Sequence, residues 1–288
     1  MNPEPILSVR GLSKHFPVMS RGVRAKQTGV VKAVDDVSFD LAPGETLGLV
    51  GESGSGKTTT ARCILRAIEP TAGQVIFRLP DGRTVDIASL SDRALKPLRQ
   101  HAQMVFQDPF SSLNPRMTVG NIVGEPLVIH GLARKAELED RVVEVLRRVG
   151  LKPEHRARYP HAFSGGQRQR IGIARALIMK PSLIVCDEAT SALDVTIQAQ
   201  VLDLLKELQT EFQLTYLFVA HNLDVVRNFC GRVAVMRRGR IVELAETARI
   251  FAAPEHPYTK ILLSAIPSAD PDVPMNFAVA EELAKLDR

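Results

Sequence analysis

Cysteine and long apolar runs are both scarce in this sequence of 288 residues. Its three cysteines, Cys63, Cys186 and Cys230, are widely spaced and form no C-x-x-C pair. This argues against a disulfide framework or a cysteine metal site and predicts reduced thiols in the cytosol. No run approaches the roughly 18 apolar residues of a membrane-spanning helix, and residues 1–5 do not resemble a signal peptide. We therefore expect any work at a membrane to be done from the cytoplasmic side, through a partner.

Internal repeats and low-complexity tracts are missing too, and the composition is that of a globular protein. Hydrophobic residues make up 45% of the chain and charged residues 24%, which leaves ample material for a core. The formal net charge of +5 suits a nucleotide, an anionic membrane surface or a nucleic acid, and equally an ordinary basic surface. Charge alone does not choose among these partners.

A glycine-rich stretch at residues 51–58 carries the strongest functional signal. It reads GESGSGKT and fits G-x-x-x-x-G-K-[ST], a loop whose backbone N–H groups hold phosphates. Apolar residues 46–50 predict a buried strand before it, and the spacing over 59–68 predicts a helix whose N-terminus favours anions. Lys57 would reach the outer phosphates, and Thr58 would help to hold Mg²⁺. The predicted nucleotide contacts here are Gly51, Ser53, Gly54, Ser55, Gly56, Lys57, Thr58 and Thr59.

A pair of acids follows a second apolar strand, at residues 183–186. Mg²⁺ that bridges two phosphates needs a hard oxygen ligand opposite the Thr58 hydroxyl, and Asp187 can supply it. Glu188 comes next and can polarise the attacking water as a general base. The alternative is that the two acids merely cap the next helix. We favour the catalytic role because the phosphate-binding loop lies in the same chain.

Alternating apolar residues predict a small β-layer near the N-terminus. Residues 6–9 and 33–41 alternate as strands, and they flank a polar, basic segment at 17–29 that we expect to be an exposed loop. Further strands are expected at 75–77, 104–106, 215–220, 232–236 and 241–244.

Helical spacing covers much of the middle of the chain. It extends over 119–149, where we expect Pro126 and Gly131 to break it into pieces. This region has the character of a helical insertion between two parts of a sheet. Further helices are expected from residue 164 to Pro181, over 195–210 and over 258–265.

Six motifs in order resemble those of the nucleotide-binding subunits of ATP-binding cassette (ABC) transporters, over roughly residues 5–250. The S-G-G-Q stretch separates this family from other P-loop ATPases, because its helix N-terminus offers a second anion cradle. The family's leading leucine is replaced here by Phe163. The motifs are the Walker A loop at 51–58, the Q-loop at Gln107, the signature at 164–167, the Walker B strand at 183–188, the D-loop at 191–194 and the switch His221.

The resemblance implies that ATP is shared between two cassettes arranged head to tail. Ser164, Gly165, Gly166 and Gln167 would bind the ATP held by the Walker A loop of the second cassette. Asp194 would shape the contact between the two. An ordinary glycine-capped helix is the alternative for this stretch taken alone.

The resemblance also implies the remaining site residues. His221 would hold the γ-phosphate and keep the attacking water in line, and Gln107 would touch both Mg²⁺ and that water. Phe16 is expected to stack on the adenine, with His15 as its rival. The catalytic set is then Lys57, Gln107, Glu188 and His221, and the Mg²⁺ ligands are Thr58, Gln107 and Asp187.

The fold implied by the family is α/β. A P-loop NTPase cassette with a RecA-like core would span residues 5–250, with an antiparallel β subdomain and a helical subdomain inserted at about 110–175. A short C-terminal extension would follow at 251–288. The cofactors implied are ATP and Mg²⁺.

Two further stretches resemble the dipeptide, oligopeptide and nickel importer subfamily. Residues 105–115 read VFQDPFSSLNP, like its extended Q-loop, and residues 256–259 read HPYT, like its C-terminal motif. Some members carry an iron–sulfur cluster in this tail, but no cysteine lies beyond Cys230, so we expect none.

The resemblance therefore implies an ATPase that energises solute import, with di- or oligopeptides favoured as cargo. Its partners would be a second, paralogous ATPase subunit, two transmembrane permease subunits and, indirectly, an extracytoplasmic solute-binding protein. It would sit at the cytoplasmic face of the membrane and would not bind nucleic acid. The alternatives are an importer cassette for nickel or another small solute and, less favoured, a non-transport ABC ATPase. The segment between Gln107 and Ser164 is too short for the coiled-coil arms of a DNA-repair ATPase.

Overall fold

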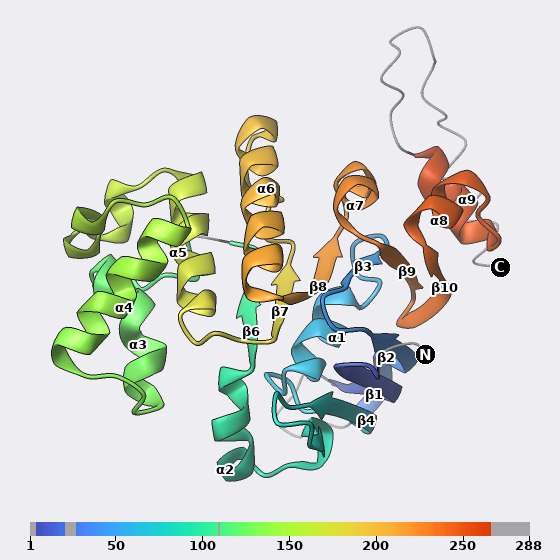
Figure 1. Cartoon of the computed structure of the whole chain (residues 1–288). Coiled ribbons are helices and arrows are strands. Elements are labelled where there is room, and N and C mark those ends of the chain that lie inside the picture. Colours follow the sequence, from blue (N-terminus) through green and yellow to red (C-terminus); the bar gives the residue numbers. More distant parts are fainter. Residues whose placement is uncertain (1–3, 21–26, 109, 266–288) are drawn as a thin grey trace, which may run out of the picture.

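The structure is a computed structural model and describes residues 4–20, 27–108 and 110–265 (Figure 1). Two sheets organise it, one of six strands and one of four. In chain order the strands and helices are β1 (Leu7–Met19), β2 (Gln27–Leu41), β3 (Thr46–Val50), α1 (Lys57–Ile64), β4 (Ala72–Arg78), β5 (Thr84–Asp86), α2 (Asp92–Leu95), β6 (Ala102–Val105), α3 (Val119–Ile129), α4 (Lys135–Arg148), α5 (Gly165–Leu177), β7 (Leu183–Asp187), α6 (Val195–Phe212), β8 (Thr215–Ala220), α7 (Leu223–Phe229), β9 (Arg232–Arg237), β10 (Arg240–Glu246), α8 (Thr247–Ala252) and α9 (Pro257–Ser264).

The six-stranded sheet forms the centre of the molecule. Its strand order is β10-β9-β3-β8-β7-β6, with parallel pairing throughout except between β9 and β10. Every residue of β3, β7 and β8 is buried. Parallel sheets are covered on both faces, so their strands become continuous apolar runs. This explains why these three strands are readable from sequence.

Successive residues of the central strands pack into two different apolar clusters. Val185 and Leu217 belong to the cluster that contains α1 and the four-stranded sheet. Ile184 and Phe218, one position along each strand, belong to the cluster that contains residues of α3, α5 and α6. This period of two follows from the pleat of a strand. The sheet is thus packed on both faces, and its carboxyl edge carries the loops that follow β3, β6, β7 and β8.

The four-stranded sheet is antiparallel, in the order β2-β1-β4-β5. It contains the predicted strands, but the prediction of an exposed loop over residues 17–29 is wrong at both ends of that segment. Pairing of β1 with β2 continues through Pro17 and Val30 to Met19 and Gln27. The side chains there are exposed, although Met19 and Val30 are apolar, because backbone pairing does not require burial. Residues 21–26 of that segment lie outside the described residues.

The helices α3, α4 and α5 gather beside β6, at the opposite end of the molecule from α8 and α9 (Figure 1). The helical pattern predicted over 119–149 corresponds to α3 and α4. Gly131 separates them with a left-handed φ of 67°, but Pro126 lies inside α3 and does not break it. A proline removes one intrahelical hydrogen bond, and α3 continues through that loss for three more residues, to Ile129.

Both ends of the helix after the phosphate-binding loop differ from the prediction. Helix α1 begins at Lys57 rather than at residue 59, and it ends at Ile64 rather than at residue 68. The chain leaves the helix because Arg66 adopts a left-handed φ of 52°.

Within the described residues no helix combines the length and apolar character needed to cross a membrane.

Candidate functional site

The predicted phosphate-binding loop joins the end of β3 to the start of α1. Gly51 and Gly56 have φ values of 152° and 104°, in the region that favours glycine. A Cβ at Gly51 would lie 2.1 Å from the Met236 carbonyl oxygen, and one at Gly56 would lie 2.1 Å from the Ala33 carbonyl oxygen. These two glycines therefore let the loop lie directly against the backbones of β9 and β2.

Lys57 lies across the inside of this loop. Its Nζ donates hydrogen bonds to the carbonyl oxygens of Gly51 and Glu52, each at 2.8 Å, and to Ser55 Oγ at 3.4 Å. The side chain is 5% exposed, and burial lowers its pKa. The ammonium is held by neutral oxygens, which an anionic ligand can replace with stronger, charge-assisted bonds.

Asp187, at the end of β7, is paired with Thr58 at the start of α1. Thr58 Oγ1 donates to Asp187 Oδ1 at 2.8 Å, and Arg62 lies 3.9 Å from the other carboxylate oxygen. Asp187 is 1% exposed, and burial raises its pKa despite the Thr58 bond and the Arg62 charge, which act to lower it. A nearby cation would stabilise the ionised form of this buried carboxylate, which burial disfavours.

Three predicted catalytic residues converge on one atom. Glu188 Oε2 accepts a hydrogen bond from Gln107 Nε2 at 2.8 Å and lies 3.0 Å from His221 Nδ1. The three residues follow β7, β6 and β8, which are neighbours in the sheet. In parallel sheets, ligands bind outside the carboxyl ends of the strands. Here those ends bring together side chains from three separate stretches of sequence.

The backbone at Glu188 is unusual for a residue with a side chain. Its φ is 48°, in the left-handed region, and its N–H donates to the Val219 carbonyl oxygen at 3.0 Å. Such conformations cost free energy for non-glycine residues and often occur at functional sites. The turn directs the carboxylate away from the strand and toward Gln107 and His221.

These groups surround a pocket of about 370 Å³. Of the predicted nucleotide contacts, Gly51 and Ser55 are not among the residues that line it, because both lie on the buried side of the loop. The lining residues are Ala33, Ser53, Gly54, Gly56, Lys57, Thr58, Thr59, Gln107, Glu188 and His221.

The predicted signature residues lie apart from this pocket, at the N-terminus of α5. Ser164 is exposed, and its hydroxyl accepts from the Gln167 N–H at 3.3 Å while Gln167 Oε1 accepts from the Ser164 N–H at 3.1 Å. This reciprocal capping begins the helix. Gly165 is half-buried, and Gly166 is buried against α6, where a Cβ would lie 2.4 Å from Ile197 Cγ2.

Asp194 lies near these residues but acts locally on α6. Its carboxylate accepts from the Ile197 N–H at 2.9 Å and caps the first turn of that helix. Asp194 is itself exposed, as is Val195 beside it, at 82%. Ser164 and Asp194, at the N-termini of α5 and α6, are therefore both accessible.

Phe16, the predicted adenine-stacking residue, is on β1 and is 39% exposed. The Lys14 ammonium lies 5.0 Å from the centre of its ring. Phe16 does not line the pocket, whereas Ala33 of the neighbouring strand does. Its role in stacking stays a prediction.

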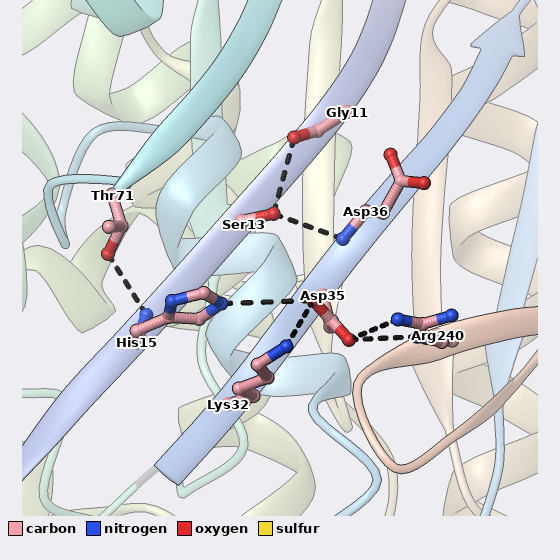
Figure 2. A network of polar contacts seen from close by, with 8 residues as sticks. All are labelled: Gly11, Ser13, His15, Lys32, Asp35, Asp36, Thr71 and Arg240. Atoms are coloured by element: carbon pink, nitrogen blue, oxygen red, sulfur yellow. Dashed lines mark hydrogen bonds and ion pairs between the residues drawn. The ribbon is translucent and has the colours of Figure 1, made fainter. Parts of the chain in front are cut away.

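The rival aromatic residue, His15, belongs to a polar network (Figure 2). Its Nε2 lies 3.8 Å from Asp35, which also binds Lys32 at 3.5 Å and Arg240 of β10 at 2.6 Å. The Arg240 guanidinium lowers the pKa of Asp35. Because Asp35 also donates its N–H to the Gly239 carbonyl oxygen, the network ties β2 to the β9–β10 turn and holds Ala33 at the pocket.

Sequence reasoning missed the residues that support the loop from behind. The Gly239 N–H donates to the Ser55 carbonyl oxygen at 2.9 Å, and the Glu52 N–H donates to the Tyr258 hydroxyl at 3.1 Å. The HPYT stretch was a recognisable signal for Tyr258, although nothing in the local pattern indicates its contact.

Comparisons with known sequences identify two regions of similarity. Residues 34–191 match the family described as ABC transporter, and residues 242–283 match the family described as oligopeptide/dipeptide transporter, C-terminal region. A peptide import ATP-binding protein of Brucella ovis is 54% identical over 272 residues, which cover 94% of this chain and 82% of the relative. The glutathione import ATP-binding protein GsiA of Salmonella paratyphi A is 53% identical over 93% of this chain, which spans 42% of GsiA.

Solved structures show the same fold. A dimeric ATP-binding cassette in a post-hydrolysis state, bound to ADP and Pi, aligns with a TM-score of 0.70 and 28% identity over 84% of this chain and 98% of that one. The protein cbiO1 from Clostridium perfringens, part of the transporter complex cbiONQ, aligns with a TM-score of 0.72 and 27% identity over 87% and 92%. These likenesses confirm the predicted α/β cassette fold.

Proposed function

The chain belongs to the ABC transporter family of ATP-binding proteins, and on that premise we propose that it hydrolyses ATP to energise the import of peptides. The observation that carries the proposal is the single oxygen, Glu188 Oε2, held between Gln107 and His221 beside the phosphate-binding loop. An acid so placed orients a water molecule and accepts its proton as the water attacks.

Lys57 and the loop amides supply the binding of the phosphates in this proposal. Lys57 exchanges the carbonyl oxygens of Gly51 and Glu52 for phosphate oxygens, and the N–H groups at the start of α1 face the same anion. With its Nδ1–H donating to Glu188, His221 would donate to the γ-phosphate from Nε2 as an imidazolium, the form in which both ring nitrogens carry a proton. Phosphoryl transfer depends on this kind of positioning and charge stabilisation.

The residues around Asp187 fit a bound Mg²⁺. The Thr58 hydroxyl, the Asp187 carboxylate and the Gln107 amide oxygen are hard oxygen donors, and the raised pKa of Asp187 indicates a buried carboxylate short of positive charge. Among the described residues no group of three or more His, Cys, Asp or Glu is arranged to hold a metal ion by itself, and a bound Mg²⁺ would take its remaining ligands from phosphates and water. When bound, Mg²⁺ neutralises charge on the phosphates.

Two cassettes are proposed to close on ATP. Residues 164–167 and Asp194 of each would face the nucleotide of the other, and the exposure of Ser164 and Asp194 supports this. A dimeric cassette bound to ADP and Pi is among the similar structures. Because ATP binds differently to the open and closed states, the pair can bias two permease subunits between conformations. We place the assembly at the cytoplasmic face of the membrane, with residues 5–250 as the ATP-binding domain and 251–288 as its extension.

Peptides are the proposed cargo. The similarity of residues 242–283 to an oligopeptide/dipeptide transporter region supports this, as do relatives named for peptide and glutathione import. Nickel import is not favoured by these likenesses. The partner subunit is proposed to be a paralogue, and an extracytoplasmic solute-binding protein would deliver the cargo. Its identity, established by co-purification with the intact complex, would define the peptide.

Glu188→Gln, reconstituted with its permease partners, tests the mechanism. We expect ATP binding to persist, the closed dimer to accumulate and hydrolysis to fall on the order of 100-fold or more, because the amide cannot accept the proton. Glu211→Gln, a matched change in a surface ion pair with Arg148, should hydrolyse ATP at the normal rate. Undiminished hydrolysis in Glu188→Gln would show that the base is wrongly assigned.

A further inference from the structure

The side chain of Tyr258 connects the C-terminal helix α9 with the phosphate-binding loop. Its hydroxyl oxygen accepts the hydrogen bond from the Glu52 N–H, across 206 positions of sequence. Tyr258 is fully buried, and the Arg237 guanidinium lies 5.1 Å from the centre of its ring. The contact is therefore part of a packed interior and not a surface encounter.

The peptide group that Tyr258 contacts belongs to the site of Lys57. The N–H of Glu52 is held by Tyr258, and the carbonyl oxygen of the same peptide group, that of Gly51, accepts from Lys57 Nζ at 2.8 Å, as does the carbonyl oxygen of Glu52 itself. A shift of this residue would move an oxygen that holds the ammonium. Tyr258 thus acts on the phosphate-binding ammonium of Lys57 indirectly, through Glu52.

The position of Tyr258 is itself built by strand β10. The Glu243 carboxylate accepts hydrogen bonds from the N–H groups of Glu255 and His256, at 2.9 and 3.0 Å. His256 Nδ1 then accepts from the Tyr258 N–H at 3.1 Å and caps the first turn of α9. The backbone N–H groups of residues 255, 256 and 258 are each held by a side chain, so the phenol enters the interior at a defined point.

The same hairpin supports the loop a second time. Gly239, in the β9–β10 turn, donates its N–H to the Ser55 carbonyl oxygen at 2.9 Å. The loop is thus supported at Glu52 and at Ser55, on either side of Gly54. Both supports approach from outside the pocket and leave its interior free for a ligand.

We propose that Tyr258 is a positioning residue that holds the phosphate-binding loop in its nucleotide-binding shape, so that the C-terminal segment helps to set the affinity for ATP. The inference rests on the proposed function, since it presumes that this loop binds ATP, and it gives the C-terminal extension a role within the cassette. Tyr258 does not touch the reacting atoms and is not a catalytic residue.

The chemistry of a buried phenol suits this role. Burial raises the pKa of Tyr258, so its hydroxyl stays protonated and places no negative charge beside the phosphates. Binding is also reciprocal: if the contact favours the loop that binds ATP, then ATP must favour the docked position of α9 by the same factor.

Tyr258→Phe in the full chain removes the hydroxyl and keeps the ring. The loss of one hydrogen bond to a buried N–H is expected to weaken binding of a fluorescent ATP analogue roughly three- to tenfold. The matched control is Tyr216→Phe. Tyr216 is equally buried and donates to the Leu205 carbonyl oxygen at 3.0 Å, away from the pocket. It should lose a similar amount of thermal stability but bind the analogue normally.

Hydrogen exchange on the unmodified chain gives a second measurement. Amides of residues 258–264 should exchange more slowly when ATP is present, and Tyr258→Phe should reduce this protection. Equal affinity in Tyr258→Phe and the unmodified chain, equal weakening in both Tyr→Phe variants, or unchanged exchange in α9 would each overturn the inference. Failure of the unmodified chain to bind the analogue would instead overturn the proposed function.

Discussion

Gly166→Ala is expected to destabilise the chain by overpacking the contact between α5 and α6. A Cβ at this position would lie 2.4 Å from Ile197 Cγ2, far inside van der Waals contact. Forcing an extra methyl into a packed interface costs about 1–3 kcal/mol. Relief of the helix-propensity cost of glycine offsets about 0.5–1 kcal/mol at most. We therefore expect a net loss of about 1 kcal/mol, and at most about 2.5 kcal/mol, in the free energy of unfolding.

Ile197→Ala should rescue this variant, and Ile197→Val should not. Alanine removes Cγ2, which leaves the nearest remaining Ile197 atom, Cβ, at 3.7 Å from the new methyl group, an ordinary contact. Valine retains Cγ2 and so retains the clash. Urea unfolding of the two single variants and the double variant forms a double-mutant cycle. Its coupling energy should be favourable, at about 1–3 kcal/mol.

The same variants test why the signature motif carries a glycine here. The Cα–Cβ direction of Gly166 points at α6, not at the exposed surface where Ser164 lies. ATP hydrolysis by the assembled transporter should therefore fall in Gly166→Ala and return in the double variant together with stability. If stability returns while hydrolysis stays low, then the added methyl group disturbs something other than Ile197, and the reasoning is refuted.

Two further substitutions should raise stability. Asp187→Asn should abolish Mg²⁺-dependent hydrolysis, because it removes a proposed Mg²⁺ ligand. It should also raise the Tm of the nucleotide-free chain: burial raises the pKa of Asp187, so the carboxylate charge destabilises the fold at neutral pH. That penalty disappears as pH falls through the raised pKa toward the ordinary aspartate value of 3.8, so calorimetry should show the Tm advantage narrowing as pH falls, and a constant advantage would contradict this cause. Gly172→Ala in α5, where a Cβ meets nothing within 4 Å, should add about 0.5–1 kcal/mol without loss of hydrolysis; an unchanged or lower urea midpoint would contradict it.

The catalytic cluster is the part of the site most accessible from sequence. Gln107, Glu188 and His221 each follow a short apolar stretch that reads as a buried strand. Parallel strands bring their carboxyl ends to one edge of a sheet, so side chains far apart in the chain can be expected to meet there. What sequence could not supply is the left-handed turn at Glu188, because nothing in its local pattern indicates a positive φ.

Two other elements differ from the prediction, each for its own reason: exposure does not exclude a strand, and a proline does not always end a helix. The hairpin extension through Pro17 and Val30 is exposed in the structure, including the apolar Met19 and Val30, yet it is paired as a sheet. Pro126 is a helix breaker by local rules, but α3 contains it. Its neighbours Val123 and Leu127 are buried in the apolar cluster, and this tertiary packing outweighs one lost hydrogen bond.

The contact between Tyr258 and Glu52 could not be predicted from the local sequence. Hydrophobic spacing predicts α9 and the HPYT stretch resembles a known motif, but neither indicates what the phenol touches. That depends on the register of β9 against β3, which pairs Val235 with Val50. This pairing sets Met236 and Arg237 alongside the first residues of the loop, and Arg237 covers the Tyr258 ring. A shift of one residue in that register would turn Arg237 to the other face of the sheet, so the support of the nucleotide site from the C-terminal segment is a property of the folded sheet.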